Sequence, residues 1–324
     1  MKNKEDINRA DKMSDRLLPS FEEKHRKLYD KHTIQLNHRL AESGLFTEEA
    51  IGKLIERCDK EHYIVATMGY NKEVKEWRNG EIGDLSGLEV IDAIRKGRMW
   101  MNIHRIMDRD PQYQVILDKI FGELVEHMPQ FRTFKRNMTL LISSPKIQVY
   151  YHADIQGQTL WQIAGKKRVY VYPATDAFIS DKSIEKVLLR ETEEEVPYES
   201  WFDEYAEVYD LEPGQMVHWP LYGPHRVENE DCLNISVTTE HWTREIWNAY
   251  VVNYGNGVLR RTLGLQKFSQ KPEGLHVYPK AAASLLWKKV KIAKTREFKH
   301  TIDFRVDPRA DKGLIDIDPY EISA

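Results

Sequence analysis

Between residues 21 and 135, apolar side chains recur with the spacing of α-helices. One stripe follows the i, i+3, i+4, i+7 pattern: Ile51, Leu54, Ile55 and Cys58. The pattern predicts a helical region over 21–135, after a charged, flexible arm at 1–20. Capping signals mark three helix starts within that region: Thr47, Ser86 with Glu89, and Asp110 before Pro111.

Beyond residue 135 the pattern changes to short runs of β-branched and aromatic residues, broken by Pro, Gly and Asn. Such runs are typical of strands. Many strands without intervening helices favour a sandwich or barrel over a parallel α/β sheet. We therefore predict a β core over 136–245. A helix at 281–296 and a strand at 300–306 then belong to a mixed C-terminal extension over 246–324, so the expected fold class is α+β.

Charge and composition narrow the function classes. The 324 residues include 48 Lys and Arg and 51 Asp and Glu, a formal net charge of −3. This near balance argues against nucleic acid or an anionic membrane as the main partner. No run approaches the roughly 18 apolar residues of a spanning helix, and the charged start is unlike a secretory signal. Two cysteines, Cys58 and Cys232, exclude a disulfide framework and a cysteine-rich zinc site. The expected location is the cytoplasm.

Residues that bind metals occur together in the predicted β core. His152 and Asp154 are two positions apart on a predicted strand, so both side chains are expected on one face. His225 opens another strand after a proline-rich turn and is the candidate third ligand. Two histidines and a carboxylate on one side of a metal leave the opposite positions open, as in the facial triad of non-haem Fe(II) enzymes. The alternative is a structural histidine–carboxylate pair. His218 is expected to be a core histidine.

Lys167 lies 13 residues after Asp154, beyond the turn at Gly165-Lys166, and shares one face of its predicted strand with Val169 and Val171. A lysine among inward-facing apolar residues is costly unless an anion is its partner. That anion is either a protein acid such as Glu228 or the carboxylate of a bound ligand. Arg226, by contrast, is expected to form a local salt bridge.

The motifs resemble one known family, the JmjC/cupin-like Fe(II)- and 2-oxoglutarate-dependent oxygenases, especially their asparaginyl-hydroxylase-like branch. The resemblance implies a double-stranded β-helix (jelly-roll) core, with His152, Asp154 and His225 as iron ligands. It also implies that Lys167 binds the distal carboxylate of 2-oxoglutarate. It extends over about residues 139–239 and is carried by His152-Ala-Asp154, the segment from Gln162 to Pro173, Pro213-Gly214-Gln215, Trp219-Pro220 and His225.

The other contacts of the co-substrate stay open at this point. The hydroxylase branch has a threonine three residues before its first histidine, and this position is Val149 here. Four residues are candidates for a second co-substrate contact: Thr139, Asn102, Gln158 and Asn234.

The resemblance implies a dioxygenase that hydroxylates a C–H bond of a protein, peptide or small molecule, with Fe(II) and 2-oxoglutarate as cofactors. Demethylation of an N-methyl group by the same chemistry is the first alternative. A cupin-type metal enzyme that does not use 2-oxoglutarate is the second, and a binding module without catalysis is the third. A homodimer is also expected, since dimers are common among related proteins.

Overall fold

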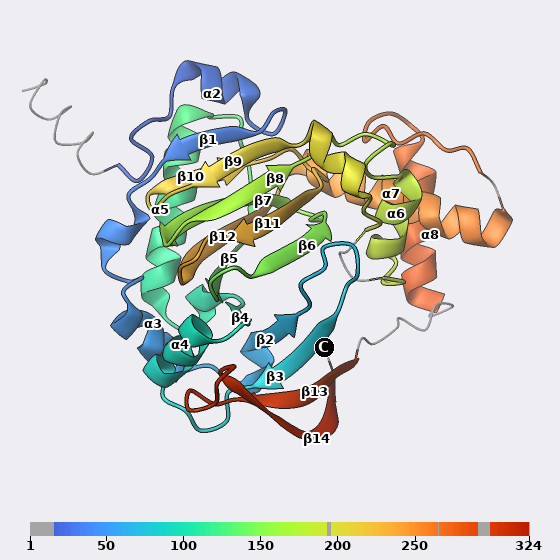
Figure 1. Ribbon diagram of the computed structural model, residues 1–324. Helices are drawn as coiled ribbons and strands as arrows, with labels where there is room; N and C mark the ends of the chain where they lie inside the picture. Colours follow the sequence, from blue (N-terminus) through green and yellow to red (C-terminus); the bar gives the residue numbers. More distant parts are fainter. Residues whose placement is uncertain (1–15, 193–195, 265, 291–298, 324) are drawn as a thin grey trace, which may run out of the picture.

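Two sheets of short strands form the centre of the molecule, which a computed structural model describes for residues 16–192, 196–264, 266–290 and 299–323 (Figure 1). Neighbouring strands are antiparallel except for one parallel pair in the larger sheet. The four-stranded sheet has the order β6 (Gln148–His152), β11 (His225–Asn229), β8 (Lys167–Val171) and β9 (Glu207–Leu211). The ten-stranded sheet has the order β1 (Ile34–Asn37), β10 (Gln215–His218), β7 (Gly157–Ala164), β12 (Asn234–Trp242), β5 (Phe134–Ser143), β4 (Trp100–Ile103), β2 (Tyr63–Met68), β3 (Trp77–Glu81), β13 (Lys299–Val306) and β14 (Leu314–Ser323).

Side chains alternate along each strand, so each sheet has one inward-facing row of residues. The inner faces of the two sheets pack against each other. On β8, every second residue is buried, which turns Lys167, Val169 and Val171 inward. Apolar residues of both sheets meet in one cluster: Leu160, Val169, Val171, Leu211, Val217, Trp219 and Val227. The chain therefore has an α+β fold with a jelly-roll core, as the sequence predicts.

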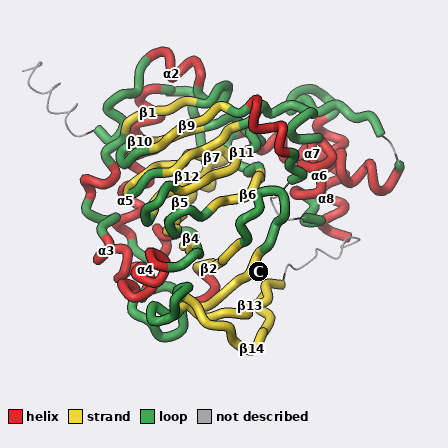
Figure 2. Tube along the Cα trace, viewed as in Figure 1, coloured by secondary structure: helices red, strands yellow, loops and turns green. Residues whose placement is uncertain are grey.

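Helices cover the outer face of the ten-stranded sheet, as Figure 2 shows. α3 (Glu48–Ile55), α4 (Gly87–Lys96) and α5 (Pro111–His127) contribute to the largest apolar cluster, together with outward-facing residues of β5 and β12. The predicted caps are confirmed. Thr47 and Ser86 accept hydrogen bonds from the third backbone N–H of their helices, and Asp110 caps α5 with Pro111 at its first position.

A second group of helices lies beside the four-stranded sheet. α6 (Asp181–Leu188) belongs to the long connection between β8 and β9, and it packs against α7 (Arg244–Leu263) through an aromatic cluster that includes Tyr172 and Tyr254. α7 also contacts α8 (Val277–Val290). Within the described ranges, every helix is too short or too polar to cross a membrane. In the described part of the chain, the other helices are α2 (Glu23–Leu28) and short 3-10 helices at Leu40–Ser43, Lys60–His62, Ile106–Asp108 and Ser200–Tyr205.

The prediction for the N-terminal third was wrong in part. The region 21–135 is not wholly helical, because it also contains β1 to β4, which extend the ten-stranded sheet. The predicted arm is also too long: Leu18 is buried, and the backbone N–H groups of Leu17 and Leu18 donate to the Glu123 carboxylate at 2.7 and 2.9 Å. Residues 1–15 of that arm lie outside the described residues.

The C-terminal extension follows the prediction more closely. The helix expected at 281–296 corresponds to α8, which starts earlier at Val277, while residues 291–298 lie outside the described ranges. The strand expected at 300–306 is β13. It pairs parallel with β3 and antiparallel with β14, so the end of the chain returns to the edge of the large sheet.

Candidate metal centre

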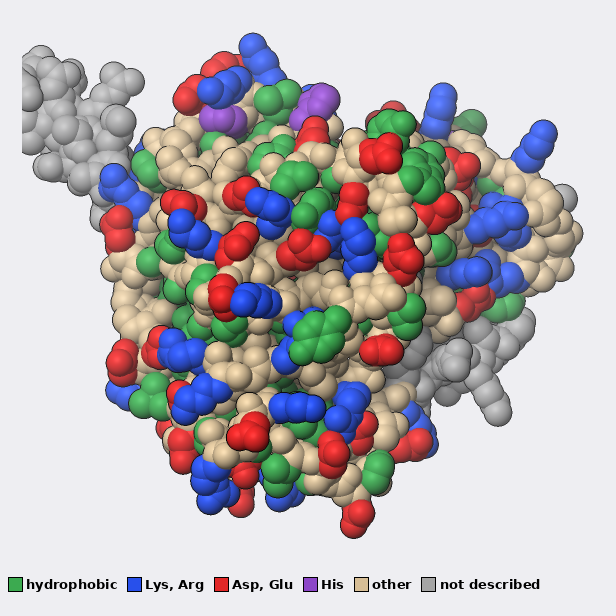
Figure 3. All heavy atoms as spheres, viewed as in Figure 1, with side chains coloured by type: hydrophobic (Ala, Val, Ile, Leu, Met, Phe, Trp, Pro, Cys, Tyr) green, Lys and Arg blue, Asp and Glu red, His purple; other side chains and the backbone are tan. Residues whose placement is uncertain are grey.

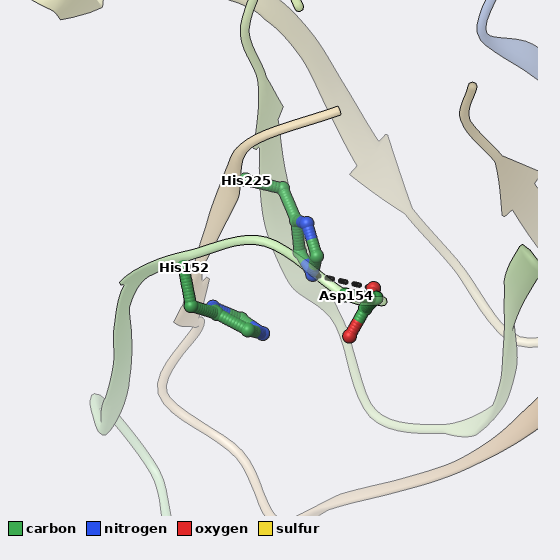
Figure 4. Close-up of side chains that lie close together, drawn as sticks. All are labelled: His152, Asp154 and His225. Atoms are coloured by element: carbon green, nitrogen blue, oxygen red, sulfur yellow. Dashed lines mark ion pairs between the residues drawn. The ribbon is translucent and has the colours of Figure 1, made fainter. Parts of the chain in front are cut away.

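The three predicted ligands converge at one end of the jelly roll. His152 ends β6 and His225 begins β11, and the register places these two residues opposite each other. Asp154 lies in the loop after β6, so the expected strand ends two residues earlier than predicted. One ligand atom from each residue lies within 4.8 Å of the other two. Figure 4 shows the three side chains pointing to a common centre, with Nε2 of His225 3.6 Å from Oδ2 of Asp154.

Backbone carbonyls orient both imidazole rings. Nδ1 of His152 lies 2.7 Å from the Tyr150 carbonyl, and Nδ1 of His225 lies 3.1 Å from the Gly223 carbonyl. Each Nδ1 therefore carries the hydrogen and donates it, which leaves the Nε2 lone pair for the centre. Such outer contacts fix the tautomer and orientation of metal-binding histidines.

Burial keeps both histidines neutral. It lowers the pKa of His152 from its usual 6.5 to about 4, and the pKa of His225 lies well below the usual value, with the nearby His152 as a further cause. Neutral imidazole is the form that binds a metal, so neither ring has to lose a proton near pH 7.

The donor set fits a divalent metal better than a structural ion pair. A separation of 3.6 Å between His225 and Asp154 is too long for a hydrogen bond. The rings of His152 and His225 are only 4.1 Å apart between centroids. Two neutral nitrogens and one carboxylate oxygen match the facial triad of Fe(II). Among the described residues, this is the group of histidine, cysteine and acidic side chains close enough to hold a metal ion.

A cavity of about 330 Å³ extends from this centre between the two sheets, and its lining includes all three ligands and Lys167. The register of β11 on β8 places His225 opposite Val171 and Asn229 opposite Lys167. Four residues of strand correspond to about 13 Å. The backbone positions of Lys167 and of the metal ligands are therefore at opposite ends of the cavity.

Lys167 is a buried cation in this cavity. It is 5% exposed, and none of the described residues forms a hydrogen bond or ion pair with its Nζ atom. Burial lowers the pKa of Lys167 from its usual 10.5 to about 7. Glu228, the acid considered as its partner, instead accepts hydrogen bonds from Arg226 and Tyr170. The expected local salt bridges of Arg226 are therefore present, and one of them takes up Glu228.

Three of the four further co-substrate candidates line the cavity: Thr139, Asn102 and Gln158. The Thr139 hydroxyl is buried and has no hydrogen-bond partner among the described residues. Asn234 does not line the cavity, although it is fully buried. Its Oδ1 accepts from Gln162 Nε2 at 2.7 Å, and its Nδ2 donates to the Cys232 carbonyl at 3.0 Å. The prediction for Asn234 is therefore wrong in position, because protein groups satisfy its amide.

Other cavity residues were missed by the sequence reasoning. Asn229 lies opposite Lys167 and donates to Ser143 Oγ and to the Ser144 carbonyl, both at 2.8 Å. Alternation from His225 would have found it, since positions 225, 227 and 229 share a face. At the other end the lining also contains polar side chains with no motif to mark them: His104, Asn137, Gln156 and Glu240.

His218 is a core histidine, as expected. It is fully buried, its ring stacks on Tyr29 at 4.0 Å between centroids, and Nε2 lies 3.0 Å from Oδ1 of Asp30. It does not line the metal cavity. Burial alone therefore does not separate a ligand from a structural histidine in this fold, whereas the direction of the Nε2 atom does.

Comparisons with known proteins give short or distant similarities. No protein-family model matches the chain. The tRNA wybutosine-synthesizing protein 5 of Danio rerio is 42% identical over 65 residues, which are 19% of this chain and 20% of that protein. The match thus spans about one fifth of that relative's length.

Among solved structures, the ribosomal oxygenase YcfD of Escherichia coli superposes with a TM-score of 0.45 at 12% identity, covering 89% of this chain and 74% of that one. Its complex with cobalt and 2-oxoglutarate gives a TM-score of 0.43 at 14% identity, with 85% and 70% covered.

Proposed function

We propose that this chain is an Fe(II)- and 2-oxoglutarate-dependent dioxygenase that hydroxylates a C–H bond. One observation carries the proposal: a His–Asp–His triad and a buried lysine without a protein anion lie at opposite ends of one cavity. The names of the similar proteins support it, since YcfD is called an oxygenase and was solved with cobalt and 2-oxoglutarate. Because the co-substrate lysine of the resemblance corresponds to Lys167 on β8, the activity is proposed to be that of the asparaginyl-hydroxylase-like branch.

His152, Asp154 and His225 would hold the metal through two Nε2 atoms and one carboxylate oxygen. An iron(II) ion at this position would supply the oxidative chemistry by which O2, 2-oxoglutarate and a substrate C–H bond give succinate, carbon dioxide and a hydroxylated product. The carbonyls of Tyr150 and Gly223 keep both rings aimed at the metal. The apolar cluster between the sheets excludes water from the cavity wall.

Lys167 would bind the far carboxylate of 2-oxoglutarate. The charges then balance inside the cavity, because Lys167 and a divalent metal together compensate Asp154 and the two carboxylates of the co-substrate. A bound anion also raises the lowered pKa of Lys167 and keeps its ammonium charged. Thr139, with its unpaired buried hydroxyl, is the best placed second contact. Asn102 and Gln158 line the same cavity.

The substrate is proposed to be a protein, a peptide or a small molecule. On the face drawn in Figure 3, acidic and basic side chains are interspersed, without the single-sign surface that tracks a nucleic-acid backbone. The name of the curated relative refers to tRNA, and the solved oxygenase is a ribosomal one. The cytoplasmic location and the homodimer stay predictions.

Anaerobic titration of the Fe(II)-loaded protein with 2-oxoglutarate tests the proposal. Wild type should develop the visible metal-to-ligand charge-transfer band, and H152A should not. H276A is the matched control, because His276 is only partly buried, lies outside the cavity lining and is hydrogen-bonded to the Lys271 carbonyl. Absence of the band in saturated wild type would refute the use of 2-oxoglutarate.

Three further measurements separate the alternatives. If K167A keeps full activity, a cupin-type enzyme without 2-oxoglutarate is favoured. If succinate release by wild type never exceeds that of H152A, the chain is a binding module. Formaldehyde among the products would indicate N-methyl demethylation instead of stable hydroxylation.

A further inference from the structure

Glu240 lies in the wall of the metal cavity and has no part in the proposed metal or co-substrate binding. Its strand, β12, places it opposite Asn137 on β5 and Gln158 on β7. β7 starts three residues after Asp154, so this row lies at the metal end of the large sheet. Gln156, in the loop between Asp154 and β7, donates to Glu240 and connects it to the metal loop.

The carboxylate is oriented by neutral amides instead of a cation. Nε2 of Gln156 and Nδ2 of Asn137 donate to the same oxygen, Oε2, at 2.9 and 3.2 Å. No donor among the described residues reaches Oε1, and no described lysine or arginine lies within ion-pair distance of Glu240. The side chain is only partly buried, so Oε1 is available to a ligand.

The neighbouring titratable group does not neutralise this charge. His104 lines the same cavity and is attracted by Glu240, but burial is the larger effect and lowers the pKa of His104. Its imidazole is therefore neutral at pH 7. In the proposed complex, Lys167 and the metal compensate Asp154 and 2-oxoglutarate, and a further cation at the metal end, Lys75, acts on His152. Within the described ranges, the polar contacts of Glu240 come from neutral amides alone, so its charge has no ion-pair partner of its own there.

We infer that Glu240 is a substrate-binding residue that recognises a positively charged nitrogen, an ammonium or guanidinium group, on the molecule to be oxidised. The inference rests on the proposed function and specifies its substrate class. Asn137 and Gln156 fix Oε2, which directs Oε1 to the bound cation. A charge-assisted hydrogen bond of this kind orients a side chain whose C–H bond then faces the metal.

The probes are pairs of similar shape and different charge. N-acetylargininamide is compared with neutral N-acetylcitrullinamide, and N-acetyllysinamide with neutral N-acetylnorleucinamide. Binding is measured by saturation-transfer NMR on the Zn(II)-loaded protein with 2-oxoglutarate. At least one cationic probe should bind wild type about tenfold more tightly than its neutral partner, the factor of one charge-assisted hydrogen bond. The guanidinium and ammonium arms show which cation the cavity prefers.

One variant of Glu240 removes the charge at nearly constant volume, and a second keeps the charge on a shorter side chain. E240Q should lose the preference for the cationic probe, and E240D should keep it in weakened form even if E240Q does not fold. E230Q is the matched control, since Glu230 is exposed and outside the cavity lining. It should behave as wild type.

Two results would overturn the inference: equal or undetectable binding of cationic and neutral probes to wild type, or a cation preference that survives in E240Q. Binding of 2-oxoglutarate is measured on the same samples. If it fails, the proposed function fails. If it succeeds while the probes do not discriminate, only the role of Glu240 is wrong.

Discussion

Replacing Lys167 with methionine should stabilise the protein without ligands while removing its affinity for 2-oxoglutarate. Lys167 is 5% exposed and has no anion among the described residues, and its pKa falls from 10.5 to about 7. A shift of this size corresponds to about 5 kcal/mol of unfolding free energy, at 1.4 kcal/mol per pH unit. Methionine has a similar length and no charge. K167M should therefore gain up to about 5 kcal/mol at pH 7.

The gain should depend on pH in one direction. Below pH 7 the lysine is protonated in both states, so wild type bears the full cost of the buried charge. Between pH 7 and 10.5 the unfolded chain binds a proton that the folded chain does not, and wild type gains about 1.4 kcal/mol per pH unit. By pH 9 the advantage of K167M should be about 2 kcal/mol.

Urea unfolding of chelator-treated protein at pH 7 and pH 9 measures both effects. Addition of Zn(II) and 2-oxoglutarate should stabilise wild type and leave K167M at its value with Zn(II) alone. K166M is the matched control, because Lys166 is 59% exposed and pairs with Glu212 at the surface. It should change stability by less than about 1 kcal/mol. The reasoning fails if K167M is less stable than wild type at pH 7, or if their difference does not vary with pH.

Three other substitutions separate co-substrate contacts from structural polar groups. T139V removes a buried hydroxyl without a partner, so calorimetry should show a Kd for 2-oxoglutarate about tenfold higher with no loss of stability; unchanged affinity would rule out this contact. N234A should lower the unfolding free energy by about 2 kcal/mol and leave that Kd unchanged; weaker 2-oxoglutarate binding would restore Asn234 to the site. H218A should lower stability by about 2 kcal/mol with Co(II) affinity retained in an absorption titration, whereas lost affinity would make His218 a ligand.

Local signals predicted the parts of the fold that depend on neighbouring residues. The caps of α3, α4 and α5 act within one turn, and all three were identified from their residue types. β1 to β4 were not identified, because each is four to six residues long and acquires its partners only in the folded chain. β1, for instance, pairs with β10 from a distant part of the sequence. A run of four residues has no periodicity that separates a strand from a turn of helix.

Sequence periodicity identifies which face of a strand a side chain is on. It does not identify whether that side chain lines the cavity or lies beyond its end. Asn234 and Glu240 lie on the same side of β12, six positions apart. Asn234 contacts Gln162 and belongs to a closed network, whereas Glu240 lines the cavity. The position of a side chain relative to the cavity depends on where the loops and neighbouring strands end. These end points are set by the whole sheet. The sequence therefore located the triad and Lys167 through motifs, while the polar residues around them became visible only in the structure.

The distinction between satisfied and unsatisfied buried polar groups bears on the three functional alternatives. Arg226 and Asn234 are buried, and protein acceptors and donors surround them, so fold stability accounts for both. Lys167 and the Thr139 hydroxyl are buried in one cavity without such partners, at a cost to stability. A cupin-type enzyme that uses only the metal has no need of a cation at the opposite end of its cavity, and neither has a binding module. A dicarboxylate co-substrate supplies the missing anion. A 2-oxoglutarate-dependent oxygenase is therefore the alternative that accounts for both the metal ligands and the buried lysine.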